Sequence, residues 1–212
     1  MKYLFIDASE NLTHVQTGTE KGFKSKTIDT NRDFAAKITE ICDNLLADEG
    51  WKQSDLTHLV VCTGPGSLTG LRVADSFLRT IAMLSNIPLI GIDLFTWSIQ
   101  TAQDAGITGE ARFVMPTLID KAFEVKANLS CKTASKPVLI EKNAIPSEIK
   151  TFGIRYSRNK AVEELIPSPE ALHKLILESA PNAKAGIDEI LKVLPLYIIP
   201  SQAERNFKGG DK

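Results

Sequence analysis

The fold of this chain is decided by the stretch Cys62-Thr63-Gly64-Pro65-Gly66-Ser67-Leu68-Thr69-Gly70-Leu71-Arg72-Val73. The apolar run at 59–62 is typical of a buried strand, and residues 70–85 carry the apolar spacing of a helix. A glycine-rich turn between a strand and a helix points backbone N–H groups at one spot, which is how many proteins hold phosphates. The turn therefore has two candidate roles: it binds a phosphate, or it brings the next helix close to the sheet.

Three short runs before this stretch predict an antiparallel meander, at residues 2–6, 13–17 and 23–28. A helix is expected next at 34–46, with Asn31 or Asp33 as its N-cap and Gly50 beyond its end. The strand at 59–62, the helix after the glycines and an apolar run at 88–92 favour a parallel strand-helix-strand unit.

Three strands, a helix, a strand, a helix and a strand are the element order of one lobe of the actin-like ATPase (ribonuclease H-like) α/β fold. In that fold an early hairpin turn carries an Asp and hydroxyl residues that face a nucleotide, and Asp7 and Ser9 occupy this place.

The second half of the chain is less regular and predicts a smaller second lobe. Its expected elements are a helix at 94–105, a hairpin of strands 113–119 and 123–129, a strand at 138–140 and a helix at 169–179 capped by Ser168. No linker separates the halves. The change in character near 94–109 predicts lobes at 1–100 and 101–212.

Composition excludes several classes of protein. A net charge of −1 over 212 residues provides no field that steers the protein to nucleic acid, so an RNA contact is local or made through a partner. The lysines of the second half alternate with acids, which is typical of a solvated face. No run reaches the roughly 18 apolar residues of a membrane helix. An odd count of three cysteines predicts reduced thiols and a cytoplasmic protein.

The glycine turn matches neither common phosphate motif. No Lys follows its last glycine, and the spacing G-x-G-x-x-x-G has one residue too many for the dinucleotide fingerprint. Arg72 is a candidate phosphate ligand, whereas Ser67 or Thr69 would cap the helix if the turn serves close packing. Asp7 is likewise either a ligand for a metal-nucleotide or a turn residue that bonds N–H groups two residues on. The candidate phosphate-facing residues are Asp7, Ser9, Gly64, Gly66, Ser67, Thr69, Gly70 and Arg72.

Hydrolase and metal chemistry find little support in the residues. Ser67 directly follows a glycine, so the G-x-S-x-G spacing of a nucleophile elbow is missing. His14, His58 and His173 are isolated, and there is no Cys-x-x-Cys pair, so we expect no metal site. Asp120 and Glu124, on the expected hairpin, are interpreted as structural carboxylates.

The helix after the glycine turn is apolar over more than half of its circumference. Its polar side chains form a narrow stripe of Arg72, Asp75, Ser76 and Arg79. A helix of this kind is buried on more than one side, either against another protein or under the second lobe.

With Asp7-Ala8-Ser9 and the glycine stretch both in view, the chain resembles the TsaB (YeaZ) family, bacterial proteins needed to make threonylcarbamoyladenosine beside the tRNA anticodon. The resemblance is strongest over residues 1–95, with weaker echoes at Asp120, at Glu124-Val125 and at 195–197. The sequence departs from the family pattern at four places. They are Ala8 for Thr, Leu68 for Phe, Asn31-Arg32 where a His opens the first long helix, and Ile198-Ile199 where an Arg follows the C-terminal Tyr.

The resemblance implies a scaffold without activity of its own, which docks on the catalytic subunit TsaD and works with TsaE. It implies that tRNA is contacted through the complex and that no cofactor is required. The family's helix-helix dimer also pairs with itself, and whether this chain alone is a homodimer through the same helices stays open. The His-x-x-x-His pair of TsaD is absent here. The helix-helix dimer of the family implies an interface of Phe34, Ile38, Ile41, Leu45, Val73, Phe77, Leu78 and Ile81.

Two other functions stay open. The first is an ATPase or a sugar- or acid-kinase-like enzyme of the same superfamily, with ATP-Mg held by Asp7, Ser9 and the glycine turn. It needs a second phosphate loop, which the second half does not display. The second is a self-contained RNA-binding module, whose tRNA binding would be tight and sensitive to salt.

Overall fold

A computed structural model describes residues 1–30, 33–117, 120–141, 149–154, 162–196 and 198 of the chain. The first sheet has the strand order β3-β2-β1-β4-β5. Its strands are β1 (Tyr3–Asp7), β2 (Leu12–Thr19), β3 (Gly22–Asp29), β4 (His58–Cys62) and β5 (Leu89–Ile92). The first three pair antiparallel, whereas β1, β4 and β5 run parallel. The expected meander, the parallel unit and the actin-like α/β fold are confirmed.

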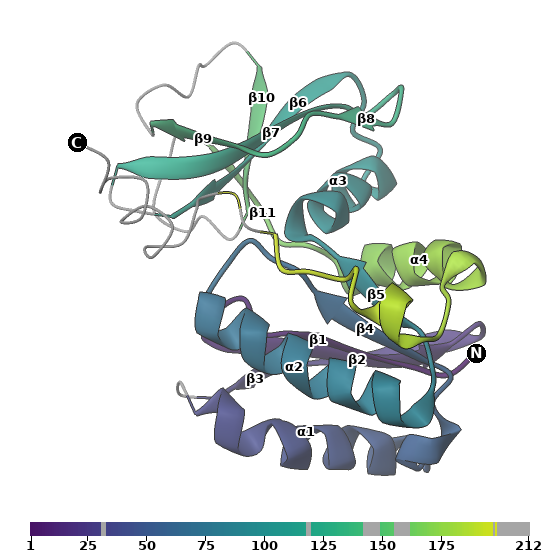
Figure 1. The fold of residues 1–212 in the computed structure, drawn as a ribbon. Helices are drawn as coiled ribbons and strands as arrows, with labels where there is room; N and C mark the ends of the chain where they lie inside the picture. The colour runs from purple at the N-terminus through teal and green to yellow at the C-terminus, as the bar shows by residue number, and fades with distance from the viewer. Residues whose placement is uncertain (31–32, 118–119, 142–148, 155–161, 197, 199–212) are drawn as a thin grey trace.

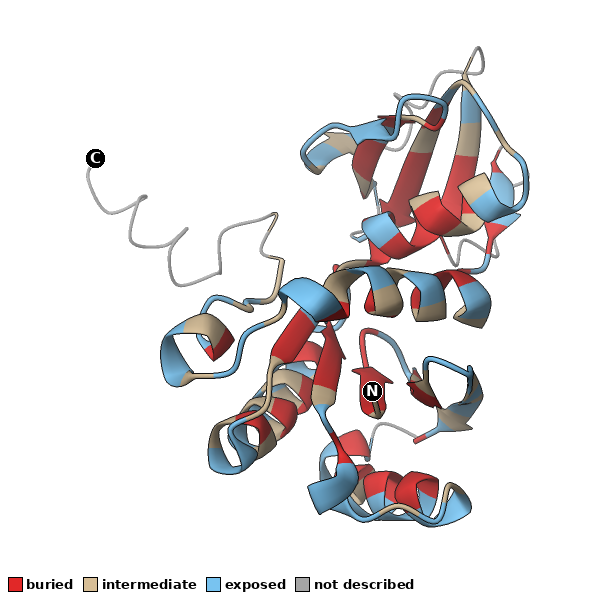
Figure 2. Cartoon of the chain, turned by 90° about the vertical axis from the view of Figure 1, so that its right-hand side faces the viewer, coloured by how far each residue is buried: buried red, intermediate tan, exposed pale blue. Residues whose placement is uncertain are grey.

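Helices cover both faces of this sheet (Figure 1). The helices are α1 (Phe34–Asp48), α2 (Leu68–Ser85), α3 (Leu94–Asp104) and α4 (Pro169–Ser179). Side chains alternate along β1, so Leu4 and Ile6 share a core with α1 and α2, whereas Tyr3 and Phe5 share another with α3 and α4. Figure 2 shows that burial is concentrated in the inner strands and on the helix faces turned toward them, and every residue of β1 is buried, whereas none of the edge strand β3 is.

The second sheet has the order β11-β10-β6-β7-β8, with β9 also paired to β7. Its strands are β6 (Glu110–Pro116), β7 (Lys121–Asn128), β8 (Thr133–Ala134), β9 (Val138–Glu141), β10 (Lys150–Ile154) and β11 (Glu163–Leu165). The expected hairpin is present, with Phe113 opposite Val125. Strands β8, β10 and β11 lie outside the sequence-based expectation, because they hold two to five residues and show no period of their own.

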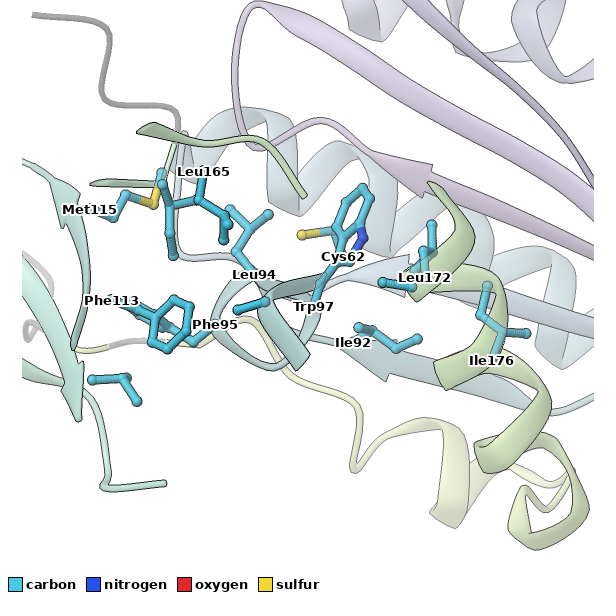
Figure 3. Close-up of a cluster of buried hydrophobic side chains, with 14 of the residues drawn as sticks. Cys62, Ile92, Leu94, Phe95, Trp97, Phe113, Met115, Leu165, Leu172 and Ile176 are labelled. Carbon is cyan, nitrogen blue, oxygen red and sulfur yellow. The ribbon is translucent and has the colours of Figure 1, made fainter. Parts of the chain in front are cut away.

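One core joins the two sheets through α3 (Figure 3). Trp97 of α3 is 2% exposed, meets the ring of Phe5 edge-on, and donates its indole N–H to the Ser168 carbonyl at 2.6 Å. From the other side, Phe113 and Phe152 of the second sheet stack on each other within the same cluster. Helix α3 therefore packs against both sheets and belongs to both lobes.

The last described elements return to the first sheet. Helix α4 contacts β3, β5 and α3, while α5 (Ile187–Ile190) contacts α2 and β5. Arg79 of α2 donates to the Val193 carbonyl, and the Leu196 N–H donates to the Thr63 carbonyl at 2.7 Å. The boundaries at 1–100 and 101–212 stay a prediction, but part of the second range packs on the first lobe.

Local signals at the helix ends are also visible. Ser168 accepts from the Ala171 N–H at 3.1 Å and caps α4, as expected. Asp33 stands at the N-cap of α1 without a side-chain hydrogen bond, and Asn31, the other candidate, lies outside the described residues. Helix α2 begins at Leu68, two residues before the expected start.

Over the described part of the chain, no helix combines the length and apolarity required to cross a membrane.

Candidate functional site

The glycine turn lies against the turn between β1 and β2. A Cβ at Gly66 would come within 2.5 Å of the Ser9 carbonyl oxygen, and a Cβ at Gly70 would overlap the Ala8 carbonyl oxygen. The Ser67 N–H donates to the Ser9 carbonyl at 2.6 Å, so one of the N–H groups that would cradle a phosphate is already bonded within the protein. This geometry supports the close-packing role of the glycines.

Ser67 caps helix α2. Its hydroxyl accepts from the Gly70 N–H at 3.4 Å, and among the described residues no histidine is hydrogen-bonded to it. The residue acts here as a helix cap rather than as a nucleophile with an adjacent base. Of the two caps that the sequence suggests, the structure uses Ser67, while Thr69 is exposed in the first turn.

Asp7 is fully buried at the end of β1, and its carboxylate accepts from the Ser9 N–H at 2.9 Å. This bond to the second residue on is the local turn that favours Asp in such a place. Ser9 is 2% exposed, so both side chains are turned into the protein. Gly64 has a φ of +94°, and its carbonyl accepts from the Leu94 N–H at 2.7 Å, which ties the turn to α3.

Arg72 is exposed on the first turns of α2 and forms no hydrogen bond or ion pair with any described residue. The structure thus brings Asp7, Ser9, Gly66, Ser67 and Gly70 together, whereas Arg72 points to solvent. Nothing in this arrangement fixes a guanidinium over the glycine turn.

Two cavities flank the turn. One, of about 340 Å³, lies between the β1–β2 turn and the first turns of α1 and α2, and is lined by Ala8, Glu10, Asn11, Thr30, Phe34, Ala35, Ser67, Thr69, Gly70 and Val73. The other, of about 330 Å³, lies between the two sheets and is lined by Ser9, Glu10, Gly66, Ser67, Met115, Pro116, Thr117 and Phe123. The second cavity faces both lobes and is the only one of the two that residues of the second sheet line.

The expected interface residues divide into two groups. Five are buried within the chain at 7% exposure or less and pack between the first sheet and its helices: Phe34, Ile38, Ile41, Leu45 and Leu78. Val73, Phe77 and Ile81 are half-buried, and Leu84, which continues the same side of α2, is 82% exposed. The residues Val73, Phe77, Ile81 and Leu84 are called the α2 stripe below. Of the expected interface residues, Val73, Phe77 and Ile81 retain some apolar surface for a partner, and the spacing of Leu84 was the signal that could have added it to the expected set.

The histidines occupy the layer beside α3 and α4. His14 lies 5.3 Å from the Trp97 ring, and His173 Nδ1 lies 2.8 Å from the Tyr3 hydroxyl. Burial lowers the pKa of both His173 and His58. No group of three or more His, Cys, Asp or Glu side chains suited to a metal ion occurs among the described residues.

The carboxylates of the hairpin have different environments. Asp120 is exposed at the turn, whereas Glu124 is 3% exposed and accepts from Arg112 at 2.7 Å. Sequence reasoning predicts a structural role for Glu124 but does not identify its partner, which lies 12 residues away on β6.

One segment of this chain matches a known family in sequence, and nearly the whole chain matches known structures in fold. A family model described as TsaD, tRNA N6-adenosine threonylcarbamoyltransferase, matches residues 26–117, from β3 to the start of the second sheet. A Pseudomonas aeruginosa protein described as similar to peptidase YeaZ has a TM-score of 0.75 at 18% identity, over 93% of this chain and 99% of its own. YeaZ from Pseudomonas aeruginosa has a TM-score of 0.72, also at 18% identity, over 92% of this chain and 99% of its own.

The two Pseudomonas structures establish that both lobes, not the first alone, follow the YeaZ fold. The family model adds a sequence match that includes the glycine turn and α2. Together these findings show a sequence likeness to the TsaD family model over residues 26–117 and the YeaZ fold over nearly the whole chain.

Proposed function

We propose that this protein is a non-catalytic scaffold subunit of tRNA N6-threonylcarbamoyladenosine synthesis that docks on TsaD through the α2 stripe. In this proposal TsaE and tRNA join through the complex, no cofactor is required, and the complex works in the cytoplasm. A homodimer through the same stripe is the resting form of the chain without TsaD.

The α2 stripe carries this proposal. Val73, Phe77, Ile81 and Leu84 follow one another at three or four residues along a helix of 18 residues, which aligns them on one side. The opposite flank of α2 is occupied within the chain, because Asp75 binds Arg79, which donates to the Val193 carbonyl. A row of apolar side chains on one side of a helix, such as the α2 stripe, is the surface by which a helix packs against a partner helix.

The closed glycine turn is the second support. Because Gly66 and Gly70 lie directly on Ser9 and Ala8, the turn has no room for a phosphate between itself and β1. Its effect is to hold the N-terminus of α2 against the first sheet, which places the stripe in a fixed position.

Replacing Phe77 by Arg tests the docking site. A charged side chain in the middle of an apolar interface must be desolvated without a partner, so we expect loss of co-purification with TsaD. Glu178→Arg is the matched control: Glu178 is exposed on α4, across the first sheet from α2, and its substitution should leave association intact. Full association of a folded Phe77→Arg variant would refute the assignment of the stripe.

A nucleotide-dependent enzyme is the second candidate, and the cavity between the sheets is the observation in its favour. Ser9 and Ser67 on one side and Thr117 on the other offer polar groups there. Calorimetric titration with Mg-ATP separates the proposals, because micromolar binding together with steady turnover by the isolated chain would support the enzyme. Absence of heat and turnover is the result expected for the scaffold.

A further inference from the structure

A second row of exposed apolar side chains lies on the segment that follows α4. Ile187, Leu191 and Leu194 are 60%, 49% and 61% exposed, and they recur at intervals of four and three residues on α5 and just after it. Single exposed apolar side chains are ordinary, whereas several of them in one row mark a surface that meets another molecule. These three residues are called the C-terminal row below.

The C-terminal row has a fixed position because other residues of the same segment point inward. Ile190 is 1% exposed and belongs to the core between the first sheet, α1 and α2. Val193 packs on Gly91 of β5, where an added Cβ would lie 2.9 Å from Val193 Cγ1. The Leu196 N–H donates to the Thr63 carbonyl at 2.7 Å. Contacts at every third residue therefore anchor the segment, and the C-terminal row is its outward side.

Apolar surface connects the C-terminal row with the α2 stripe around the end of α2. Helix α5 contacts α2, and Arg79 of α2 donates to the Val193 carbonyl in the same segment. Met83 and Ile87 precede and follow Leu84 of the stripe, and both are half-buried against the same core as Val193. The two rows are therefore neighbouring parts of one side of the molecule.

The α2 stripe by itself is small for a docking surface. A standard protein interface uses roughly 20–30 residues on each side, and three of the four stripe residues are already half-buried. On one flank of the stripe lies α1, which lines a cavity together with Val73. Its exposed residues include Glu40 and Asp43, and charges of this kind are costly to bury without a partner. The C-terminal row, beyond the other flank, supplies the apolar area that the stripe lacks.

We propose that the C-terminal row is part of the TsaD docking site, so that TsaD covers the α2 stripe and the row together. This inference rests on the docking proposal above and extends that site to the segment after α4. The partner surface that fits is apolar opposite both rows.

Between the two rows the partner meets a low part of α2. Ser76 and Thr80 are exposed there, and their small side chains allow a partner helix to approach closely. Charges beside the C-terminal row are few. Glu189 Oε1 lies 2.6 Å from Lys192 Nζ, so Asp188 is the one charged residue of 187–194 without an ion pair to a described residue. A basic side chain of TsaD opposite Asp188 would complete the electrostatic fit.

Titration of TsaD with the full chain tests the C-terminal row. Leu191→Ser combined with Leu194→Ser should weaken association about tenfold or more, because both substitutions remove apolar area that the partner covers. Val138→Ser is the matched control and should bind as the parent does, since Val138 is 47% exposed but lies on β9 of the second sheet.

The melting midpoint of the double variant should stay near that of the parent, because both leucines are about half exposed. A clear fall of the midpoint with unchanged affinity for TsaD would show that the row is covered within the chain, and it would overturn the proposal.

Phe77→Arg separates the C-terminal row from the docking proposal on which it rests. Loss of association in Phe77→Arg, with parent-like affinity in the double variant, would overturn the row and leave the stripe as the docking site. Weaker association in the double variant alone would support the row and overturn the stripe, and parent-like affinity in both would overturn both. Sedimentation without TsaD addresses a second copy of the chain. Loss of self-association in the double variant, at unchanged affinity for TsaD, would assign the row to a homodimer and overturn the proposal.

Discussion

Gly66 and Gly70 are required at their positions, because a side chain at either one would overlap the β1–β2 turn. Ala8, which stands where the family pattern has Thr, takes part in the same contact with Gly70. It is 2% exposed and lies directly beneath Gly70, so a larger residue there would press on the first turn of α2. The contact explains why the glycines are needed without any reference to a ligand.

Gly70→Ala should destabilise the protein by about 1–3 kcal/mol, the usual range for overpacking a tight contact. The added methyl overlaps the Ala8 carbonyl oxygen, which belongs to the backbone and cannot swing away. Thermal unfolding measures the effect, and Thr69→Ala, one residue earlier and exposed, should leave the midpoint nearly unchanged. Equal midpoints for the two variants would contradict the close packing.

His173 predicts a pH dependence of stability. The Gln16 amide donates to the Tyr3 hydroxyl at 2.7 Å, which leaves that hydroxyl to donate to neutral His173 Nδ1 at 2.8 Å. Burial lowers the pKa of His173 below the ordinary 6.5, so the unfolded chain binds a proton that the folded chain resists. Stability is therefore complete above pH 6.5 and declines as the pH falls through the lowered pKa.

Chemical denaturation at a series of pH values measures this decline. In His173→Gln the part of the decline that belongs to this residue should vanish, since glutamine does not titrate in this range. The contribution of His58, whose pKa burial also lowers, stays in both proteins and serves as an internal reference. An unchanged slope in His173→Gln would exclude the residue as the source.

At the scale of the element, helix α2 divides its surface among the first sheet, the C-terminal segment and a partly exposed side. Leu71, Ala74, Leu78 and Ala82 face the sheet, and Asp75 and Arg79 face the C-terminal segment. The α2 stripe is half-buried beside the core at Val73, Phe77 and Ile81 and exposed at Leu84. The division follows from helical geometry, because residues three and four apart share a side.

Leu84→Ser tests the stripe without disturbing the fold. The side chain is 82% exposed, so its loss should change the free energy of unfolding by less than about 0.5 kcal/mol. Burial of a leucine in an interface is worth roughly 1.5–3 kcal/mol, so association with TsaD should weaken about tenfold or more. Titration of TsaD with the variant, beside its melting curve, separates the two effects, and unchanged affinity would place Leu84 outside the interface.

At the scale of the whole molecule, α3 unites two sheets that the chain forms in succession. Trp97 contacts the first sheet through Phe5 and the C-terminal segment through Ser168, and α3 also covers the inner face of the second sheet. We therefore expect the lobes to unfold together.

Trp97→Ala should cost about 3–5 kcal/mol, the range for truncating a large buried aromatic side chain. Hydrogen exchange followed by mass spectrometry should show faster exchange in strands of both sheets at once. Trp51→Ala is the control, because Trp51 is only half-buried at the edge of the first lobe, where Lys2 Nζ lies 5.0 Å from its ring centroid. Loss of protection in one sheet alone would show that the lobes are independent.

The amino-acid sequence by itself determined the first lobe, the Ser168 cap of α4 and the glycine stretch that carries the family resemblance. Strands β1 to β5 and their helices carry periods that local residues set, and the glycine stretch is long enough to be specific. Tertiary structure alone decided the pairing of β10 and β11, the burial of Phe34 and Ile38, and the meeting of Arg112 with Glu124. These features depend on contacts between segments that are distant in the sequence. A local sequence pattern shows whether a residue is polar or apolar, but it does not show which other segment will pack against that residue.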